Sequence, residues 1–142
     1  MTRITFLHNA SDRLQATAAW LGQASRGGEK MIVYAPLEGD LERLDRLLWS
    51  HPATGFTPHC FATSVLAAET PLILTTELER PAHDRCLVNL SNDIPPGFSS
   101  FEHLVEVVST ADDVRVRGRE RFRFYRERGY ALETMDISGG VA

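Results

Sequence analysis

Only two of the 142 residues are cysteines, Cys60 and Cys86, and the longest apolar runs span only a few residues. Two isolated cysteines cannot form a disulfide framework, so both are expected to be reduced thiols. The apolar stretch in residues 1–14 is too short for the core of a signal peptide. We therefore expect a cytoplasmic protein without a membrane span.

Motifs for nucleotide, metal or catalytic chemistry are also missing from the sequence. Residues 22–30 resemble a phosphate-binding loop, but a glycine stands where lysine must follow and the segment ends a predicted helix. The five histidines show neither helical pairing nor metal-ligand spacing, and His59 and Cys60 are too close in sequence to share one tetrahedral ion easily. No serine lies in a nucleophile elbow. We predict no catalytic residue, no metal and no cofactor, and an enzyme on a nucleotide-type fold ranks last among the alternatives.

Size and composition are those of an ordinary globular protein. Apolar residues make up 43% of the chain and charged residues 24%, close to the average for soluble domains. A chain of this length buries enough apolar surface to fold without metals or disulfides. We predict a single domain covering residues 1–142.

Apolar patterns predict alternating strands and helices. Short buried-type runs predict strands at Arg3–His8, Met31–Ala35, Leu72–Thr75, Cys86–Leu90 and Leu104–Val108, and an alternating run predicts an edge strand at Tyr130–Ile137. Helices are predicted after the capping candidates Asn9 and Ser11, from about Asp40 to Ser50, and from Asp112 to Gly129. Residues 52–71 are expected to form a long, partly apolar loop with a function of its own. The predicted fold is α/β, with a mostly parallel sheet between two layers of helices, Rossmann-like but without nucleotide-binding motifs.

Positive charge is concentrated in one segment near the C-terminus. Residues 114–129 contain seven arginines and two glutamates, a net charge of +5, which leaves −9 for the remainder of a chain whose net charge is −4. In a helix, Val114, Gly118, Phe122, Tyr125 and Gly129 share one face, which we predict to be buried. Beside it, Arg115, Arg119, Arg123 and Arg126 form one stripe, and Arg117, Arg121 and Arg128 form a second on the other flank.

Four arginines on one stripe indicate an anionic partner, because such crowding of like charge otherwise costs stability. A solvated helix surface with modest ion pairs is the plainer interpretation. Two kinds of partner fit the stripe: the phosphates of a nucleic acid, or an acidic peptide. The acidic remainder of the chain would repel a long polyanion, so we favour the peptide and keep direct nucleic-acid binding as the alternative.

Two blocks of the sequence resemble one protein family. The first is Leu44-Asp45-x-x-Leu48-Trp49-x-x-Pro52-x-x-x-Phe56-x-Pro58-His59. The second is Glu106-Val107-Val108 followed by Arg119-Glu120-Arg121-Phe122-Arg123-x-Tyr125-Arg126-x-x-Gly129-Tyr130. Together, and in this order, they are similar to the chi subunit of bacterial DNA polymerase III, across nearly the whole chain.

The resemblance implies a non-catalytic subunit of a DNA-directed DNA polymerase, a nucleotidyltransferase, that works in DNA replication as part of the clamp-loader complex. Chi subunits join the psi subunit to single-strand-binding protein. The implied psi contact is formed by Trp49, Pro52, Phe56 and Pro58, and this surface would serve a DNA repair helicase in cells without psi. The implied site for the acidic C-terminal tail of single-strand-binding protein is formed by Arg115, Arg119, Phe122, Arg123 and Arg126.

Overall fold

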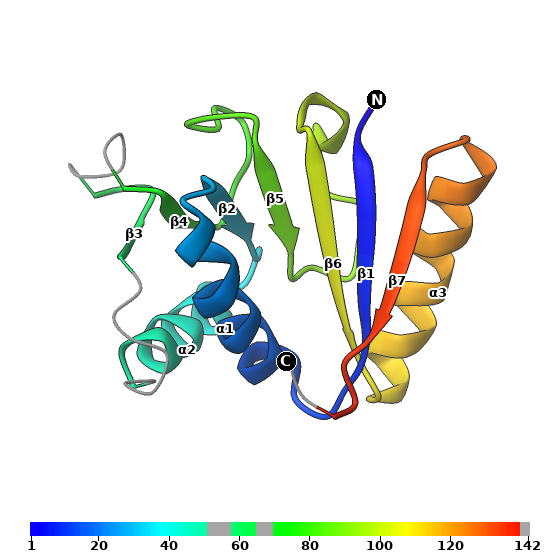
Figure 1. Cartoon of the computed structure of the whole chain (residues 1–142), viewed down its shortest axis with the longest axis horizontal. Helices are drawn as coiled ribbons and strands as arrows, with labels where there is room; N and C mark the ends of the chain where they lie inside the picture. The colour runs from blue at the N-terminus through cyan, green and yellow to red at the C-terminus, as the bar shows by residue number, and fades with distance from the viewer. Residues whose placement is uncertain (51–57, 65–69, 140–142) are drawn as a thin grey trace.

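The computed structural model describes residues 1–50, 58–64 and 70–139 (Figure 1). Its strands form one sheet in the order β3-β4-β2-β5-β6-β1-β7, and every neighbouring pair is parallel. The strands are β1 (Arg3–Ala10), β2 (Met31–Tyr34), β3 (His59–Phe61), β4 (Leu72–Thr75), β5 (Cys86–Asn89), β6 (His103–Ser109) and β7 (Leu132–Asp136). The predicted α/β fold is therefore confirmed, and the sheet is wholly parallel.

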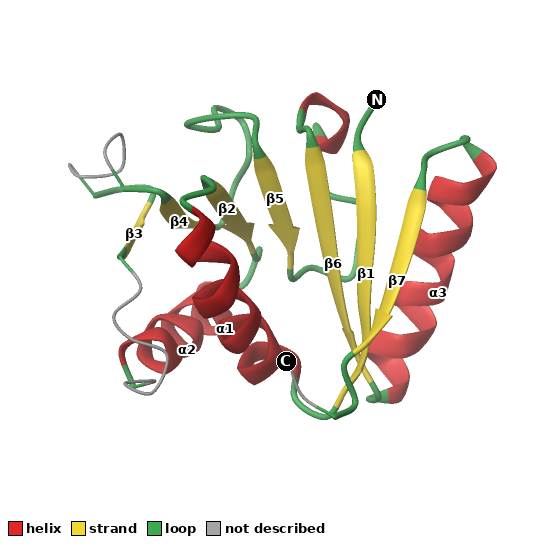
Figure 2. Ribbon diagram, in the orientation of Figure 1, coloured by secondary structure: helices red, strands yellow, loops and turns green. Residues whose placement is uncertain are grey.

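Within the described residues, three α-helices cover the sheet on opposite faces (Figure 2). Helices α1 (Arg13–Ala24) and α2 (Glu38–Trp49) lie on one face, and α3 (Asp112–Glu127) lies on the other. Short 3-10 turns at Ser25–Gly27 and Phe98–Ser100 complete the helical content of the described residues. None of these helices combines the length and the apolar character needed to cross a membrane.

Each face of the sheet has its own apolar core because side chains alternate along a strand. On the first face, Leu41, Leu44 and Leu48 of α2 and Leu21 of α1 pack with alternate residues of the strands. On the second face, Tyr125 of α3 packs with another set of strand residues, and partly buried Leu78 from the segment joining β4 to β5 packs against that cluster. Burial on both faces explains why the strands read as continuous apolar runs.

The ends of the elements differ from the predictions in a few places. Helix α1 is capped by Asp12, whose side chain accepts a hydrogen bond from the Gln15 N–H, and not by Asn9 or Ser11. Asn9 instead belongs to β1. The predicted loop at residues 52–71 contains the three-residue strand β3, which is too short to leave a pattern in the sequence.

Neighbouring strands β1 and β6 lead into helices on opposite faces. From β1 the chain enters α1, and from β6 it enters α3 (Figure 1). In open parallel sheets, binding sites lie at the carboxyl ends of strands where the connections diverge in this way. The carboxyl ends of β1 and β6 therefore form a switch point of this sheet.

Candidate functional site: a pocket between helix α3 and the sheet

Helix α3 places its arginines around a narrow buried face. It begins with Asp112 and Asp113, whose negative charge favours the positive end of the helix dipole. The buried residues of the helix are Gly118, Arg121 and Tyr125, whereas Val114 and Phe122 are half-buried. Gly129, with a φ of 83°, follows the end of the helix and is exposed, so its predicted place on the buried face was wrong.

Gly118 allows α3 to approach β6 closely. A methyl group at this position would lie 2.9 Å and 3.0 Å from the two Cγ atoms of Val108, closer than carbon atoms pack in proteins. Any larger residue would push the helix away from the strand. The glycine therefore sets the distance between α3 and the carboxyl end of β6.

A pocket of about 290 Å³ opens beside this contact. Its apolar walls are Phe6, Val108, Gly118 and Phe122, and the rings of Phe6 and Phe122 meet edge to face with centroids 5.2 Å apart. Its polar lining comes from His8, Asn9, Ser109, Arg115, Arg119 and Thr134. Three strands and one helix thus contribute to one apolar hollow with two guanidinium groups.

Three of the five residues predicted to bind the tail line this pocket, and two do not. Arg115, Arg119 and Phe122 line the pocket. Arg126 lies outside it, with its guanidinium 5.9 Å from the centre of the Phe122 ring, and Arg123 is exposed and does not line it. All four arginines of the stripe are exposed, as predicted.

The two arginines of the pocket differ in their partners. Arg115 donates a 2.8 Å hydrogen bond to Asp112, three residues earlier in the helix. Among the described residues, Arg119 has no carboxylate partner within ion-pair distance. Arg119 is therefore the arginine of the pocket that an incoming carboxylate reaches without displacing an internal ion pair.

Asn9 gives the pocket edge an uncommon backbone. Its φ is 65°, a left-handed conformation that asparagine adopts more readily than most residues. The register between β1 and β6 shifts between Leu7 and Ala10 around it. Its side chain donates a 2.9 Å hydrogen bond to Asp136, and hydrogen bonds from Ser138 and Asn9 lower the pKa of Asp136 to about 2. This irregular turn of β1 is thereby tied to β7.

Beneath α3 lies a buried polar network that centres on Glu106. Its carboxylate accepts hydrogen bonds from Tyr125 Oη at 2.7 Å, Asn89 Nδ2 at 2.9 Å and Arg121 Nε at 3.1 Å. The side chains of Glu106 and Arg121 are 0% and 3% exposed. The prediction that Arg121 belongs to an outer stripe was wrong, because an internal carboxylate compensates the charge of this arginine and allows its burial.

Burial dominates the protonation of this network. It raises the pKa of Glu106, while the Arg121 charge and the hydrogen bonds from Tyr125 and Asn89 act in the opposite direction. Burial, together with the neighbouring Glu106 carboxylate, also raises the pKa of Tyr125. At neutral pH the phenol is therefore the donor in its bond to Glu106.

Arg13 joins the carboxyl ends of β5 and β6 to the first turn of α1. Its Nε donates to the Val107 carbonyl at 2.6 Å, and its Nη2 donates to the Ser91 carbonyl at 2.8 Å. Burial, and next the nearby charge of Arg121, lower the pKa of Arg13 to about 10. Arg13 thus acts as a structural clamp, and all three of its guanidinium nitrogens donate within the protein.

The predicted psi-contact residues lie at the end of α2 and after it. Trp49 is the last residue of α2 and is 59% exposed, and its ring packs against His59 with centroids 5.2 Å apart. His59 Nε2 in turn lies 2.8 Å from Asp45 Oδ1. Pro58 is exposed, whereas Pro52 and Phe56 lie outside the described residues. The Asp45–His59 contact thus joins two residues of the first sequence block.

Several pocket residues had no signal in the sequence. His8, Asn9, Ser109 and Thr134 come from three different strands and meet α3 only through the order of the sheet. Glu106, which lies beneath α3 and outside the pocket, belongs to the second sequence block, but its pairing with Arg121 depends on which way the two elements face. Helical spacing alone predicted only the contribution of α3.

Comparisons with known proteins identify the family. The profile of the family described as "DNA polymerase III chi subunit, HolC" matches residues 1–133. The DNA polymerase III subunit chi of Pseudomonas aeruginosa is 32% identical over 137 residues, covering 94% of this chain and 95% of the relative. The corresponding subunit of Escherichia coli is 28% identical over 110 residues, covering 77% of this chain and 75% of the relative.

A third relative agrees with these two. The DNA polymerase III subunit chi of Haemophilus influenzae is 26% identical over 113 residues, covering 79% of this chain and 78% of the relative. The family match spans both sequence blocks and most of the sheet. The chain therefore belongs to the DNA polymerase III chi subunit family, the non-catalytic accessory subunits of this replicative polymerase.

Proposed function

We propose that this chi-family protein is an adaptor in the bacterial cytoplasm that holds the acidic C-terminal tail of single-strand-binding protein in the pocket beside α3. The observation that carries the proposal is the combination of an apolar hollow with two arginines at its edge. The family resemblance implies a tail that combines acidic residues with an aromatic residue and a proline near a free terminal carboxylate. Its apolar end and its negative charges match the two halves of the pocket.

The size of the pocket suits one ring and a small neighbour. An apolar cavity of about 150 Å³ holds a benzene molecule, and this pocket measures about 290 Å³. In the proposed complex the aromatic side chain lies against Phe122 and Phe6. One carboxylate of the tail lies at Arg119. A second lies at Arg115, once Arg115 has released Asp112. Arg123 and Arg126 extend the positive surface along which the remaining acidic residues approach.

The expected affinity is modest. Burial of one aromatic side chain contributes about 1.5–3 kcal/mol and each hydrogen bond to a charged group about 1.5–3 kcal/mol. Ordering the tail and losing its free motion oppose these gains. Before these costs, the aromatic and two charged contacts sum to about 4.5–9 kcal/mol, whereas a complex with a Kd of about 1 μM needs about 8 kcal/mol, so we expect binding no tighter than micromolar. Because exposed charges take part, binding should weaken as salt increases.

Fluorescence anisotropy with a labelled tail peptide tests this proposal. Arg119→Ala is expected to weaken binding at least tenfold, since it removes a charge-assisted contact worth about 1.5–3 kcal/mol. Arg80→Ala removes the same charge from an exposed position in the β4–β5 connection and serves as the matched control. A tail peptide without its last aromatic residue should bind weakly to the wild-type protein as well.

Two results would contradict the adaptor proposal. Equal peptide affinity of the Arg119→Ala and Arg80→Ala proteins would exclude the pocket. Tight binding of naked single-stranded DNA at moderate salt, together with no binding of the peptide, would favour a direct nucleic-acid-binding module instead.

We further propose that the Trp49 surface, with Pro52, Phe56 and Pro58, contacts the psi subunit. An exposed tryptophan at a helix end is the type of anchor that carries much of the energy of protein interfaces, and Trp49 is 59% exposed. Trp49→Ala is expected to abolish co-purification with psi while leaving tail binding unchanged. Retained co-purification would exclude this surface, and a repair helicase as the partner would appear as psi-independent binding that the same substitution removes.

A further inference from the structure

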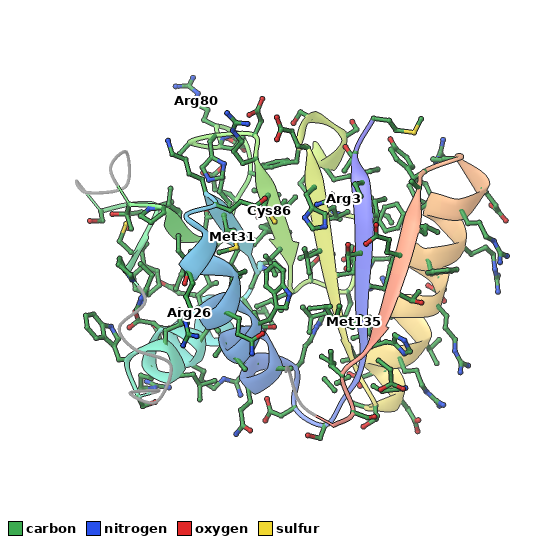
Figure 3. All side chains as sticks on the ribbon, viewed as in Figure 1. Arg3, Arg26, Met31, Arg80, Cys86 and Met135 are labelled. Atoms are coloured by element: carbon green, nitrogen blue, oxygen red, sulfur yellow. The ribbon has the colours of Figure 1, made fainter. Side chains whose placement is uncertain are left out.

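Three metal-ligating side chains meet at the amino ends of neighbouring strands, at the opposite end of the sheet from the proposed tail pocket. Glu29 precedes β2, Cys86 begins β5 and His103 begins β6. A carboxylate oxygen, the Cys86 Sγ and a ring nitrogen of His103 all lie within 4.8 Å of one another. Figure 3 labels Cys86 on β5, of which it is the first residue.

The strand register produces this cluster. Cys86 pairs with Met31 on one side and with His103 on the other, so the first residues of three neighbouring strands stand in one row. Paired residues in a sheet point to the same face. Cys86 and His103 are therefore held side by side by the backbone, and their Sγ and Nδ1 atoms are 3.9 Å apart.

We propose that Glu29, Cys86 and His103 bind one divalent transition metal ion of the zinc class. Thiolate, imidazole and carboxylate are the protein ligands that such an ion takes, and three of them leave a fourth position for water or another ligand. Bonds of about 2.3 Å to sulfur and about 2.0–2.1 Å to nitrogen at tetrahedral angles separate the two atoms by about 3.5 Å. The observed 3.9 Å needs a movement of only a few tenths of an ångström, and exposed Glu29 is free to adjust its carboxylate.

The surroundings of His103 fit this role. Its Nε2 lies 2.9 Å from Thr5 Oγ1. When Nε2 donates its hydrogen to this hydroxyl, the ring is oriented in the way typical of a metal-ligating imidazole. That arrangement leaves the lone pair of Nδ1 on the side of Cys86. Binding of the ion to the Cys86 sulfur releases the thiol proton to solvent, so that one thiolate and one carboxylate neutralise the two positive charges of the ion.

Arg3 opposes the ion and gives the proposal a directional test. Its Nη2 lies 3.4 Å from His103 Nδ1, where a positive charge repels a metal ion. Arg3 is exposed, so its side chain can turn into solvent when the nitrogen binds the metal. We expect Arg3→Gln to tighten metal binding. If Cys86 and His103 form only a weak S–H hydrogen bond and no metal site, this substitution should not change metal binding.

Ligand spacing along the sequence does not predict this cluster, because its three residues are far apart in the chain. Glu29 lies in the connection before β2, whereas Cys86 and His103 are the first residues of β5 and β6. Their proximity depends on the order β2-β5-β6, which places β2 beside β5 although β3 and β4 lie between them in sequence.

Cobalt(II) titration of the full chain tests the proposal, because a thiolate ligand gives cobalt an intense charge-transfer absorption in the near ultraviolet. The wild type is expected to bind one equivalent, and zinc should displace the cobalt and bleach the band. Cys86→Ala should abolish the band, and Cys60→Ser is the matched control that should retain it. Circular dichroism of each variant verifies that it folds.

Glu29→Gln keeps the proposal testable if Cys86→Ala does not fold, because Glu29 is exposed. We expect this variant to bind cobalt at least about tenfold more weakly, the loss typical of weakened metal coordination. A wild-type protein that binds no stoichiometric cobalt or zinc would overturn the proposal. So would an absorption band that survives Cys86→Ala or disappears with Cys60→Ser.

Discussion

Arg121 Nε lies 3.1 Å from Glu106 Oε1 in the interior, where the two side chains are 3% and 0% exposed. This ion pair joins the inner face of α3 to the middle of β6. Tyr125, one turn further along the helix, donates to the other carboxylate oxygen at 2.7 Å. The buried network therefore fixes the rotation of α3 about its axis, and with it the direction in which Arg115 and Arg119 face the pocket.

Removal of one partner from this pair should strongly destabilise the fold. Arg121→Ala leaves the Glu106 carboxylate buried without its compensating charge, which typically costs about 3–5 kcal/mol. We expect a decrease of this size in the free energy of unfolding measured by urea denaturation. Arg123→Ala, an exposed position two residues away on the same helix, should change it by less than about 0.5 kcal/mol.

Replacement of both partners distinguishes a charge effect from a loss of packing. Among the described residues, Nη1 and Nη2 of Arg121 have no hydrogen-bond partner, so the pair is not fully satisfied. An apolar pair, Glu106→Leu with Arg121→Met, should therefore be more stable than Arg121→Ala alone. If the single and double variants unfold at the same urea concentration, the uncompensated charge is not the cause.

The fold could be predicted from the sequence because its strands are buried on both faces. The runs at Leu72–Thr75 and Cys86–Leu90 are continuous and apolar, and the structure places β4 and β5 at the same positions to within one residue. The order of the strands could not be predicted, since β2 lies between β4 and β5 although it precedes both in sequence. Apolar patterns record burial and carry no information on which strand is the neighbour.

The candidate site could be predicted only on its helical side. Spacing along α3 brought Arg115, Arg119 and Phe122 together, and all three line the pocket. The same reasoning predicts Arg121 on an outer stripe, because helical spacing carries no information on Glu106 of β6, which lies beneath the helix. The opposite wall, which includes Asn9 and Thr134, depends on the parallel pairing of β1 with β7.

Gly118 gives a prediction in which two effects have opposite signs. Gly118→Ala should favour the helix by about 1 kcal/mol because alanine has the higher helix propensity. Its methyl group, however, would lie 2.9 Å from Val108 Cγ2, and such overpacking typically costs about 1–3 kcal/mol. We expect a net loss of stability in urea denaturation, together with weaker binding of the tail peptide because α3 shifts at the pocket wall.

A compensating substitution tests this steric explanation. In the Val108→Ala background the two Cγ atoms are absent, so the second substitution, Gly118→Ala, should stabilise the protein. Destabilisation of similar size in both backgrounds would contradict the close contact as the cause.

Asp45 should stabilise the end of α2 through His59. The His59 side chain is 1% exposed, and its Nε2 lies 2.8 Å from Asp45 Oδ1. Asp45→Ala leaves this buried nitrogen without that partner, which we expect to cost about 1–3 kcal/mol in urea denaturation. Glu42→Ala removes an exposed carboxylate from the same helix and should have little effect. Equal effects of the two substitutions would mean that the loss reflects helix charge and not the His59 contact.

His83 should make stability depend on pH below neutrality. Burial, and next the positive charge of Lys30, lower its pKa from the ordinary 6.5, and the Arg85 N–H occupies Nδ1 as an acceptor at 3.1 Å. The unfolded chain therefore binds a proton at His83 before the folded protein does, so this contribution to stability is complete above pH 6.5. It decreases as the pH falls from 6.5 toward the folded pKa and is lost below that value.

NMR titration of the His83 ring should give a pKa below 6.5, and His83→Gln should flatten the dependence of the urea midpoint on pH in this window. A ring that titrates at or above 6.5 would contradict the prediction.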